Sequence, residues 1–423
     1  MPAPRIRSLI FVLIFGFACA SYLQRQGIGI AAERMMPELG LTQLQIGWLM
    51  NAFLITYAVF QVPGGLVGQR FGARATIAVI GVLSVVASIV TAAAPLIATS
   101  AFMFTTLVMA RSLLGVAHGG LFPVEAGTIR HWYPVGRWSS MLGLLVTGLW
   151  TGAAIASPLV ATLMQAYGWQ AAILLTSVPS LVLVGLWWIV VRDMPGQHPW
   201  IQPAELAETA ANPPYDAAAP LTLQRVIRVL GDPQILLVTL SYLVMNYVFY
   251  LVTFWSFLYL VQGRKLSVLE SGWLGALPFV VAGVAAAGGG RIADALRHRY
   301  GDRRGPRILP LVTLPLAALF LYLTVSLEHA YTAIAALCLG FACVELNEGN
   351  YWGVAMRLAP SDSMAATAAL NTGGNLGGVI GTQLVAWLSS EGRWDAVFTT
   401  GVVTSIVAAL LWLTINPGRG VRT

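Results

Sequence analysis

Charged residues are scarce in this chain of 423 residues: 10% are Asp, Glu, Lys or Arg, against about 25% in an ordinary soluble domain. Cysteine is rarer still, and Cys19, Cys338 and Cys343 lie in apolar runs without paired spacing. This placement argues against a disulfide framework and against a cysteine metal site. The net charge of +7 comes from 23 Arg and one Lys scattered along the chain, which argues against a nucleic-acid partner.

Apolar residues make up 57% of the chain and recur in windows of about 19 residues. Twelve spanning helices of about 20 residues would occupy about 240 positions, which matches that apolar fraction. The sequence therefore predicts an all-α integral membrane protein with 12 transmembrane helices. The predicted spans are 9–31, 45–67, 75–96, 101–125, 139–165, 169–191, 235–261, 270–293, 307–327, 331–357, 364–390 and 394–415.

The predicted spans form two groups of six, separated by a segment that is rich in proline and acidic residues and has no long apolar run. We therefore predict an N-terminal six-helix half at 1–191, a cytoplasmic linker at 192–234 and a C-terminal six-helix half at 235–423. Within the linker, Pro203–Ala211 is expected to form one or two amphipathic turns on the membrane surface.

The distribution of basic residues predicts the orientation of the chain. When both termini and the even-numbered loops are placed on one side, that side holds 18 of the 24 basic residues and the other side holds four. Cytoplasmic loops are enriched in Arg and Lys, so we expect both termini in the cytoplasm of a multi-pass protein of the inner (plasma) membrane. The remaining two basic residues, Arg25 and Arg111, fall inside predicted spans.

An internal repeat supports the division into halves. The stretch Gly65–Arg74 follows the second span and Gly290–Arg297 follows the eighth, at an offset of 225 residues. Parallel six-helix repeats are a known plan of secondary transporters. The first copy resembles the loop signature of the major facilitator superfamily, with Gln69 where the family usually has Asp.

Three further stretches are similar to the anion:cation symporter family within that superfamily: Tyr22–Ala32, Thr56–Gly65 and Arg111–Pro123. That family includes bacterial galactonate, glucarate and hexuronate permeases and the animal sialin and vesicular glutamate carriers. The resemblance implies the major facilitator fold, two six-helix halves around a central cavity. It also implies cytoplasmic gate contacts, for which the matching residues are Arg70, Arg74, Asp294 and Arg297.

Arg25 and Arg111 are the candidates for binding an anion. A charge at bilayer depth is costly, so it normally faces a cavity or a partner, and a guanidinium can hold a carboxylate with two hydrogen bonds. In the resembling family, arginines at these positions bind or gate the substrate carboxylate, and Tyr22 and Tyr57 match tyrosines that hydrogen-bond it. The residues leave open a structural role for the arginines and simple aromatic packing for the tyrosines.

Two departures from the family concern proton coupling. Relatives commonly have acids where this chain has Gln24 and His118. A histidine titrates near neutral pH, so His118 is a candidate replacement, but an anion exchanger or a uniporter needs no such group. Glu345 and Glu348, three residues apart in the tenth span, are neighbours on one helix face and form a second candidate proton site.

Other polar residues in the spans complete the candidate site. Asn246 and Tyr250 are four apart in the seventh span, and Asn371 and Asn375 are four apart in the eleventh, so each pair shares a helix face. We expect them to contact polar groups of the substrate, with core packing as the alternative. Glu125 is expected to pair with a loop arginine such as Arg130.

The sequence therefore predicts a secondary active transporter of a small organic anion, such as a sugar acid, that imports it together with protons by alternating access. The alternatives are a proton-coupled exporter of drugs or other amphipathic compounds, and an anion exchanger or uniporter. An enzyme is not expected, because no nucleophile with its base, phosphate loop or metal-ligand spacing is visible. We expect no cofactor and no metal, and a protein that functions as a monomer in the lipid bilayer.

Overall fold

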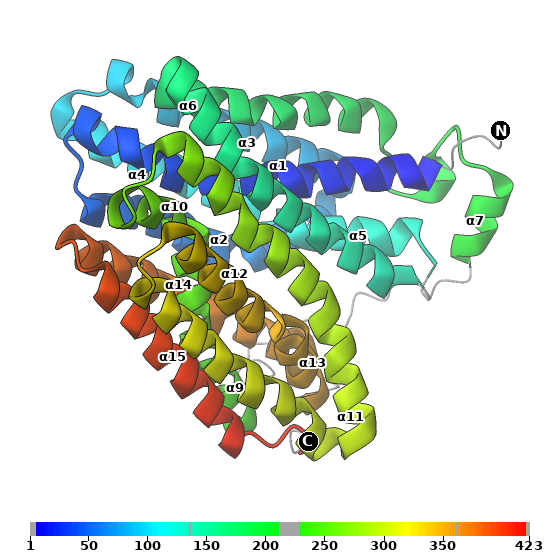
Figure 1. The fold of residues 1–423 in the computed structure, drawn as a ribbon. Helices are drawn as coiled ribbons and strands as arrows, with labels where there is room; N and C mark the ends of the chain where they lie inside the picture. Colours follow the sequence, from blue (N-terminus) through cyan, green and yellow to red (C-terminus); the bar gives the residue numbers. More distant parts are fainter. Residues whose placement is uncertain (1–5, 135–136, 211–228, 230, 360–362, 420–423) are drawn as a thin grey trace. The chain divides into compact units, whose positions relative to one another are not determined.

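The computed structural model describes residues 6–134, 137–210, 229, 231–359 and 363–419 (Figure 1). Among these residues the regular secondary structure is entirely helical. The helices of the first part of the chain are α1 (Ile6–Leu39), α2 (Gln43–Phe71), α3 (Ala73–Ile97), α4 (Ser100–Gly119), α5 (Leu121–Trp132), α6 (Trp138–Val190), the short turn η2 (Pro195–Gln197) and α7 (Pro203–Ala210).

The later part of the chain continues in the same way. Its helices are α9 (Pro233–Tyr250), η3 (Leu251–Trp255), α10 (Ser256–Leu258), η4 (Tyr259–Gly263), α11 (Val268–Ser326), α12 (Ala330–Glu345), α13 (Glu348–Leu358), α14 (Ser363–Ser390) and α15 (Trp394–Thr414). The segments η3 and η4 are π-helical and continue the line of α9, so the seventh predicted span is one irregular helix.

Two long helices each contain a single non-helical glycine. Gly168 in α6 has φ 82° and Gly301 in α11 has φ 79°. This left-handed region is open to glycine because glycine has no Cβ, and it lets the chain turn between two helices. Each of the two long helices is therefore a pair of spans, as the predicted breaks at 165–169 and 293–307 require.

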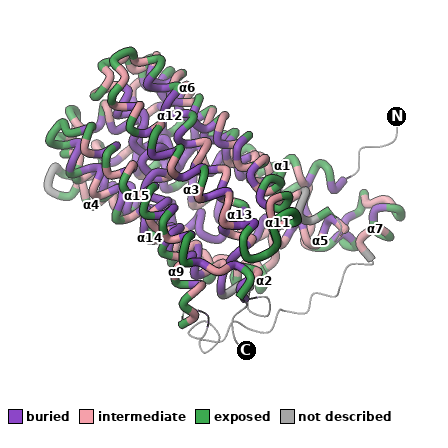
Figure 2. The backbone as a smooth tube through the Cα atoms, turned by 60° about the horizontal axis from the view of Figure 1, so that its bottom comes forward, coloured by how far each residue is buried: buried purple, intermediate pink, exposed green. Residues whose placement is uncertain are grey.

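The helices have the length and composition of membrane spans. Nine helical stretches within the described residues are apolar and long enough to cross a bilayer. Division of α6 and α11 at their glycines, together with the more polar α14, accounts for the 12 predicted transmembrane helices. Exposed residues are found on many of the helices (Figure 2). Many of them are large and apolar, such as Leu96 at 88% and Val284 at 73% exposure, which suits contact with lipid.

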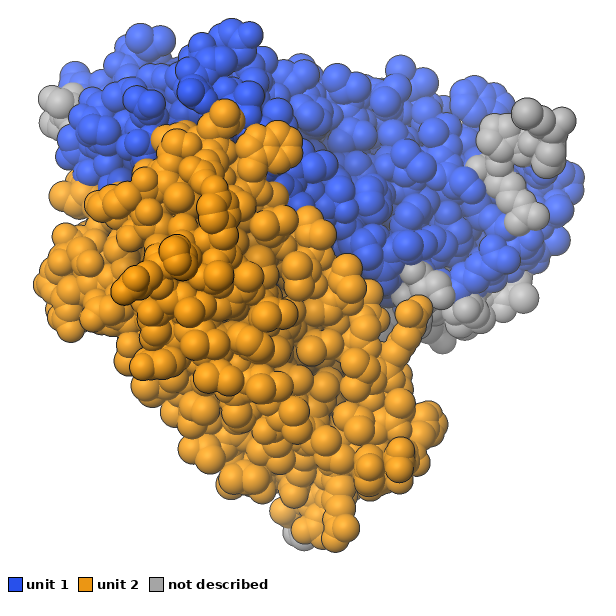
Figure 3. Space-filling model, in the orientation of Figure 1, with its two compact units in different colours: residues 1–41, 48–216 blue, residues 42–47, 217–423 orange. Residues whose placement is uncertain are grey.

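The chain divides into two compact units, coloured separately in Figure 3. Unit 1 comprises residues 1–41 and 48–216, and unit 2 comprises residues 42–47 and 217–423. In unit 1, α1 packs along α6, and α3 packs on α4 and α6. In unit 2, α9 packs on α14 and α15, and α11 packs on α12 and α15.

Glycine permits the closest helix contacts inside each unit. A Cβ on Gly115 of α4 would overlap Thr56 and the carbonyl oxygen of Phe53 on α2. A Cβ on Gly377 of α14 would overlap the carbonyl oxygen of Leu243 on α9. Small residues at such contacts let two helix backbones approach, which brings polar side chains of neighbouring helices within reach of each other.

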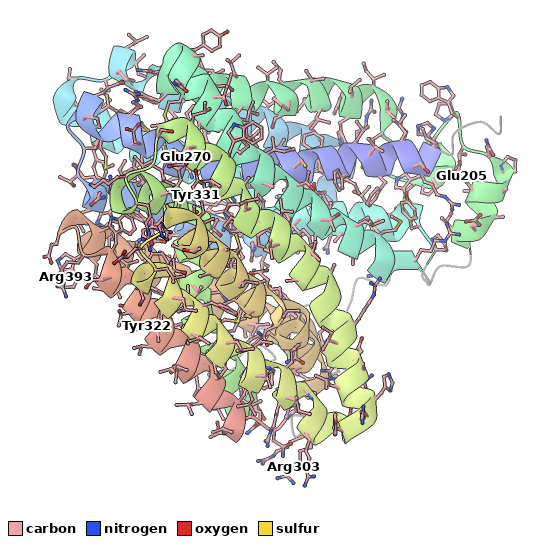
Figure 4. All side chains as sticks on the ribbon, in the orientation of Figure 1. Glu205, Glu270, Arg303, Tyr322, Tyr331 and Arg393 are labelled. Carbon is pink, nitrogen blue, oxygen red and sulfur yellow. The ribbon has the colours of Figure 1, made fainter. Side chains whose placement is uncertain are left out.

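The linker helix α7 is fixed to the start of α1. Arg7 is 3% exposed, and its Nη1 donates to Glu208 at 2.5 Å while its Nε lies 3.7 Å from Glu205, which is labelled in Figure 4. Tyr133 donates from its hydroxyl to the carbonyl oxygen of Arg7 at 3.0 Å. Burial raises the pKa of Tyr133 to about 12, so this donor keeps its proton at neutral pH. The predicted surface helix thus has specific partners on α1.

Candidate anion-binding site

Arg25 and Arg111 lie together inside unit 1. Their residues are 4% and 3% exposed, on α1 and α4. The Nη2 of Arg111 donates a long hydrogen bond of 3.4 Å to the carbonyl oxygen of Arg25. Both guanidinium carbons lie over the ring of Phe53 on α2, at 5.3 Å for Arg25 and 5.1 Å for Arg111. The structure therefore brings the two predicted anion-binding residues to one aromatic side chain.

Aromatic rings surround Arg25. Its guanidinium carbon lies 5.1 Å from the ring centre of Tyr22 and 5.4 Å from that of Tyr57, and its Nη1 donates to the Tyr22 hydroxyl at 3.4 Å. Phe53 and Tyr57 stack at 5.6 Å with an 18° angle between their planes. The faces of these rings attract a cation without neutralising it. The three rings thus hold the guanidinium group of Arg25 in place.

Phe53 is the residue of this site that the sequence analysis missed. It is fully buried and contacts Arg25, Arg111 and Tyr57. A signal was present, because Phe53 precedes Tyr57 by four residues and so lies on the same face of α2.

The charge of Arg111 is not balanced by an acid. The ion pairs among the described residues involve Arg7, Arg34, Arg297 and Arg393, and Arg111 takes part in none of them. Its Nε has no hydrogen-bond partner in that part of the chain. A buried charge without a counter-charge is unfavourable, so this position favours the arrival of an anion.

A small polar cavity lies beside Arg111 within unit 1. It is about the size of one water molecule, and its polar lining consists of Arg111, Gln24, Ser88, Thr91 and Thr176. Both amide atoms of Gln24 are buried and have no hydrogen-bond partner among the described residues. Because the three hydroxyls donate to backbone carbonyls of their own helices, their oxygens remain acceptors. The cavity therefore offers both donors and acceptors to a molecule of the size of water.

His118 belongs to the same group of side chains. It is 5% exposed, and its ring meets the edge of Phe53 at 6.0 Å with an 83° angle between the planes. His118 follows Arg111 by seven residues, so the two lie on one face of the helix. Arg111 and His118 both contact the ring of Phe53.

The predicted polar residues of unit 2 also lie together, on α9 and α14. The Tyr250 hydroxyl donates to Asn375 Oδ1 at 2.9 Å, and Asn375 Nδ2 donates to the carbonyl oxygen of Asn371 at 3.0 Å. Asn246 donates to the carbonyl oxygen of Tyr242 at 2.8 Å. These side chains are orientated by one another and by the backbone.

The two acids of the tenth span flank the break between α12 and α13. Glu348 Oε1 accepts from the Tyr242 hydroxyl and from Trp352 Nε1, each at 2.7 Å. Glu345 is 1% exposed, and neither of its oxygens has a hydrogen-bond partner among the described residues. Tyr242 and Trp352 were missed from sequence, although Trp352 lies four residues after Glu348, within reach on the same helix face.

The predicted gate residues have contacts within their own units. Arg74 donates to the carbonyl oxygen of Trp188 from Nε and Nη2, and its backbone N–H donates to Asp193 at 2.8 Å. Arg297 lies 3.9 Å from Asp294 and 3.2 Å from Asp302. Arg70, which is exposed, lies over the ring of Phe71. A gate role for Arg70, Arg74, Asp294 and Arg297 stays a prediction.

The expected pair between Glu125 and Arg130 is wrong. Both carboxylate oxygens of Glu125 are buried, and in the described part of the chain they have neither a hydrogen bond nor an ion pair. The physical reason is helix phase: five residues correspond to about 140° around an α-helix, so the two side chains point in different directions.

Within the described residues, no three His, Cys, Asp or Glu side chains lie close enough to hold a metal ion. The chemistry that the geometry does offer is electrostatic: two buried guanidinium groups, hydroxyl and amide groups nearby, and buried carboxyl groups. Together with the apolar spans, these features define a membrane carrier of polar solutes.

The chain belongs to the Major Facilitator Superfamily, whose family model matches residues 14–382. It is 27% identical to a probable sulfoacetate transporter of Cupriavidus necator over 96% of this chain and 94% of that protein. It is 25% identical to a hexuronate transporter of Bacillus subtilis over 95% of this chain and 92% of that protein.

Among solved structures, a bacterial homologue of the human lysosomal transporter Spinster, in an inward-facing and occupied conformation, has the same fold. Its TM-score is 0.77 at 15% identity, with 98% of this chain and 97% of that chain covered. The comparisons confirm the major facilitator fold and the resemblance to the anion:cation symporter group. The protein is a multi-pass membrane transporter and not an enzyme.

Proposed function

We propose that this protein is a secondary carrier of a small organic anion, such as a sugar acid or another hydroxylated carboxylate. The observation that carries the proposal is the buried pair Arg25 and Arg111, which share one aromatic ring, while Arg111 has no acidic partner among the described residues. Sulfoacetate and hexuronate, the substrates in the names of two relatives, are small anions with polar groups.

In this proposal the substrate carboxylate binds the guanidinium groups of Arg25 and Arg111, with Tyr22 and Tyr57 as hydroxyl donors. A planar guanidinium matches a carboxylate with two parallel hydrogen bonds, which gives orientation as well as attraction. The polar substituents of the substrate are met by Asn246, Tyr250, Asn371 and Asn375. The small cavity next to Gln24 supplies a water that hydrates Arg111 when the site is empty.

The proposed transport cycle is alternating access with import driven by protons. His118, Glu345 and Glu348 are the titratable groups proposed for proton uptake, while Gln24 replaces the acid that relatives commonly have. Exchange of one anion for another is the second candidate, and the neutral amide of Gln24 favours it. The proposal also includes a monomeric carrier in the inner membrane with both termini in the cytoplasm. Its two halves are residues 1–191 and 235–423, joined by the linker 192–234.

Uptake by purified protein in liposomes tests this function. The wild type is expected to accumulate a labelled carboxylate when the outside is acidic, and Arg111→Ala is expected to reduce uptake to the level of empty liposomes. Arg393→Ala is the matched control, because Arg393 is exposed and pairs with Glu391. Unchanged uptake by Arg111→Ala would sink the assignment. Uptake that requires an anion inside the liposomes but no proton gradient would favour anion exchange over proton-driven import.

A further inference from the structure

Acidic residues are very rare in the spans of unit 1. Between Arg7 and Arg192 the sequence contains three of them: Glu33, Glu38 and Glu125. Glu33 pairs with Arg34 at 3.2 Å, and Glu38 accepts a hydrogen bond of 2.7 Å from Trp169 Nε1. Both lie near the C-terminal end of α1. Glu125 is the remaining acid, and it lies inside the unit.

Glu125 is fully buried on α5, with 0% of its surface exposed. Neither carboxylate oxygen has a hydrogen-bond partner in the described part of the chain. The nearest hydroxyl on its own helix face, that of Thr128, already donates to the carbonyl oxygen of Val124 at 2.9 Å. A carboxylate anion in such a place is unfavourable, whereas a neutral carboxyl group is tolerated.

The surroundings of Glu125 are apolar, and the described core segments around α5 contain no second acid. These segments are residues 6–18 of α1, 73–83 of α3, Ala117 of α4, and 141–149 and 183–190 of α6. The charged residues in these segments are Arg7 and Arg74. Arg7 is held by Glu205 and Glu208, and Arg74 is held by Trp188 and Asp193.

The other helices that touch α5 contribute basic groups. On α2, Gly65 and Gly68 pack against Pro123 and Val124, and the nearest charged residue along α2 is Arg70. On α4 the groups are Arg111 and His118, and α5 itself carries Arg130 and His131. Hydrogen bonds and ion pairs to Glu125 from these groups are absent within the described residues.

Glu125 continues the seven-residue spacing of the anion-site residues on α4. Arg111, His118 and Glu125 are spaced by seven residues, and each step of seven returns to within about 20° of the same helix face, about 10 Å along the axis. The one break in this stretch is Gly120, whose φ of −82° and ψ of −12° stay in the right-handed region. All three side chains are buried, at 3%, 5% and 0% exposure.

We infer that Glu125 is a proton-carrying residue of the transport cycle, linked to the arginine pair through His118. The inference deepens the proposed function and rests on it. In the packed arrangement the Glu125 carboxyl keeps its O–H bond. When the helices separate during the cycle and water enters, that bond breaks, the proton passes to water, and the carboxylate takes up another proton before the core closes again. Coupling follows because proton binding and helix packing depend on each other.

The first test separates coupling from transport in liposomes. Glu125→Gln keeps the shape of the neutral carboxyl group but carries no titratable proton. It is expected to retain counterflow of a labelled carboxylate at equal pH on both sides. With an inward gradient of about two pH units, it is expected to lose uphill accumulation, so that its inside-to-outside ratio falls to about one. Glu33→Gln, at a partly buried acid that is paired with Arg34, is the matched control and keeps both activities.

The outcomes distinguish the two proposals. Proton-driven accumulation by Glu125→Gln at the wild-type level would overturn the role of Glu125 and leave the carrier function standing. No counterflow of any carboxylate by the wild type would overturn the carrier function instead. Glu125→Asp, which restores a carboxyl group, is expected to recover accumulation with a shifted pH profile, whereas a merely structural role predicts the same loss in both variants.

A measurement without substrate tests the protonation of Glu125 even if the protein transports no carboxylate. The infrared difference spectrum between acidic and alkaline samples of the purified protein shows the C=O band of each carboxyl group that loses its proton. One band that is present in the spectra of the wild type and of Glu33→Gln is expected to be missing from the spectrum of Glu125→Gln. Identical spectra of the wild type and Glu125→Gln would overturn the assignment.

Discussion

Two buried arginines in unit 1 are equally hidden and yet have opposite surroundings. Arg7, at the start of α1, is 3% exposed and is neutralised by Glu205 and Glu208 of α7. Arg111, within α4, is also 3% exposed but lies over Phe53 and beside the carbonyl oxygen of Arg25, without an acid among the described residues. The comparison teaches that burial alone does not distinguish the two arginines. The proposed anion site depends on the missing counter-charge of Arg111, because the fold provides counter-charges where Arg7 is structural.

Unit 2 repeats the contrast with acids. Glu348 accepts hydrogen bonds from Tyr242 and Trp352, whereas Glu345 has no partner among the described residues. In each unit one buried ionisable group has polar side-chain partners, Arg7 and Glu348, and another has none among the described residues, Arg111 and Glu345. The contrast predicts that mutations at the anion site change carboxylate affinity, whereas mutations at the paired groups change the free energy of unfolding.

The largest effect is expected from Arg25→Met. Loss of one guanidinium of the pair is expected to weaken carboxylate binding by about 100-fold or more, as for a desolvated charge contact. Equilibrium binding of a labelled carboxylate to the purified protein measures the change. Arg34→Met is the control, because Arg34 is half exposed and pairs with Glu33. Equal affinity in Arg25→Met and wild type would remove Arg25 from the site.

A smaller effect, on stability, is expected from Arg7→Met. Removal of Arg7 leaves Glu205 buried without its partner, so the free energy of unfolding is expected to fall by about 2 kcal/mol. Carboxylate affinity is expected to stay at the wild-type value. Thermal unfolding in detergent, followed with a thiol-reactive or intrinsic fluorescence signal, measures the first quantity. An unchanged melting temperature would show that α7 adds no stability through Arg7.

The next effect concerns unit 2. Tyr242→Phe removes one hydrogen bond to the Glu348 carboxyl and is expected to lower the free energy of unfolding by about 1 kcal/mol. Tyr247→Phe, which loses a hydrogen bond to the carbonyl oxygen of Val397, is the matched control at a site without an acid. The contrast between Glu348 and Glu345 would be weakened if Tyr242→Phe melted like the wild type.

The smallest effect is expected from Phe53→Leu. A leucine fills most of the space but has no aromatic face for the guanidinium groups, so carboxylate affinity is expected to fall about fivefold. The same binding assay measures it. Phe254→Leu on η3, far along the sequence and fully buried, is the control for loss of aromatic packing. A tighter-binding Phe53→Leu variant would contradict the arrangement of the site.

Much of the fold could be predicted from sequence because the bilayer imposes a simple rule. Apolar windows predicted the helices, and the turns at Gly168 and Gly301 lie where two windows meet. The cost of a charge at bilayer depth also predicted that Arg25 and Arg111 matter. Their common contact with Phe53 was not predicted, although Phe53 precedes the predicted Tyr57 by four residues on the same face of α2.

Other details depend on partners that are distant in sequence. Arg7 was read as a basic residue that sets orientation, and its partner Glu208 lies 201 residues away. No local pattern connects the two. Glu125 was paired with Arg130 because they are close in sequence, but helix phase separates them, which simple counting along the helix would have shown.

The central claim is that Arg111 is an uncompensated charge kept for an anion. Thermal unfolding of the wild type and Arg111→Met, with and without a panel of small carboxylates, tests it most directly. The account predicts that at least one carboxylate raises the melting temperature of the wild type, that none raises that of Arg111→Met, and that the ligand-free variant melts no lower than the wild type. A ligand-free variant that melts far below the wild type, or one that is stabilised by the same carboxylate to the same extent, would contradict it.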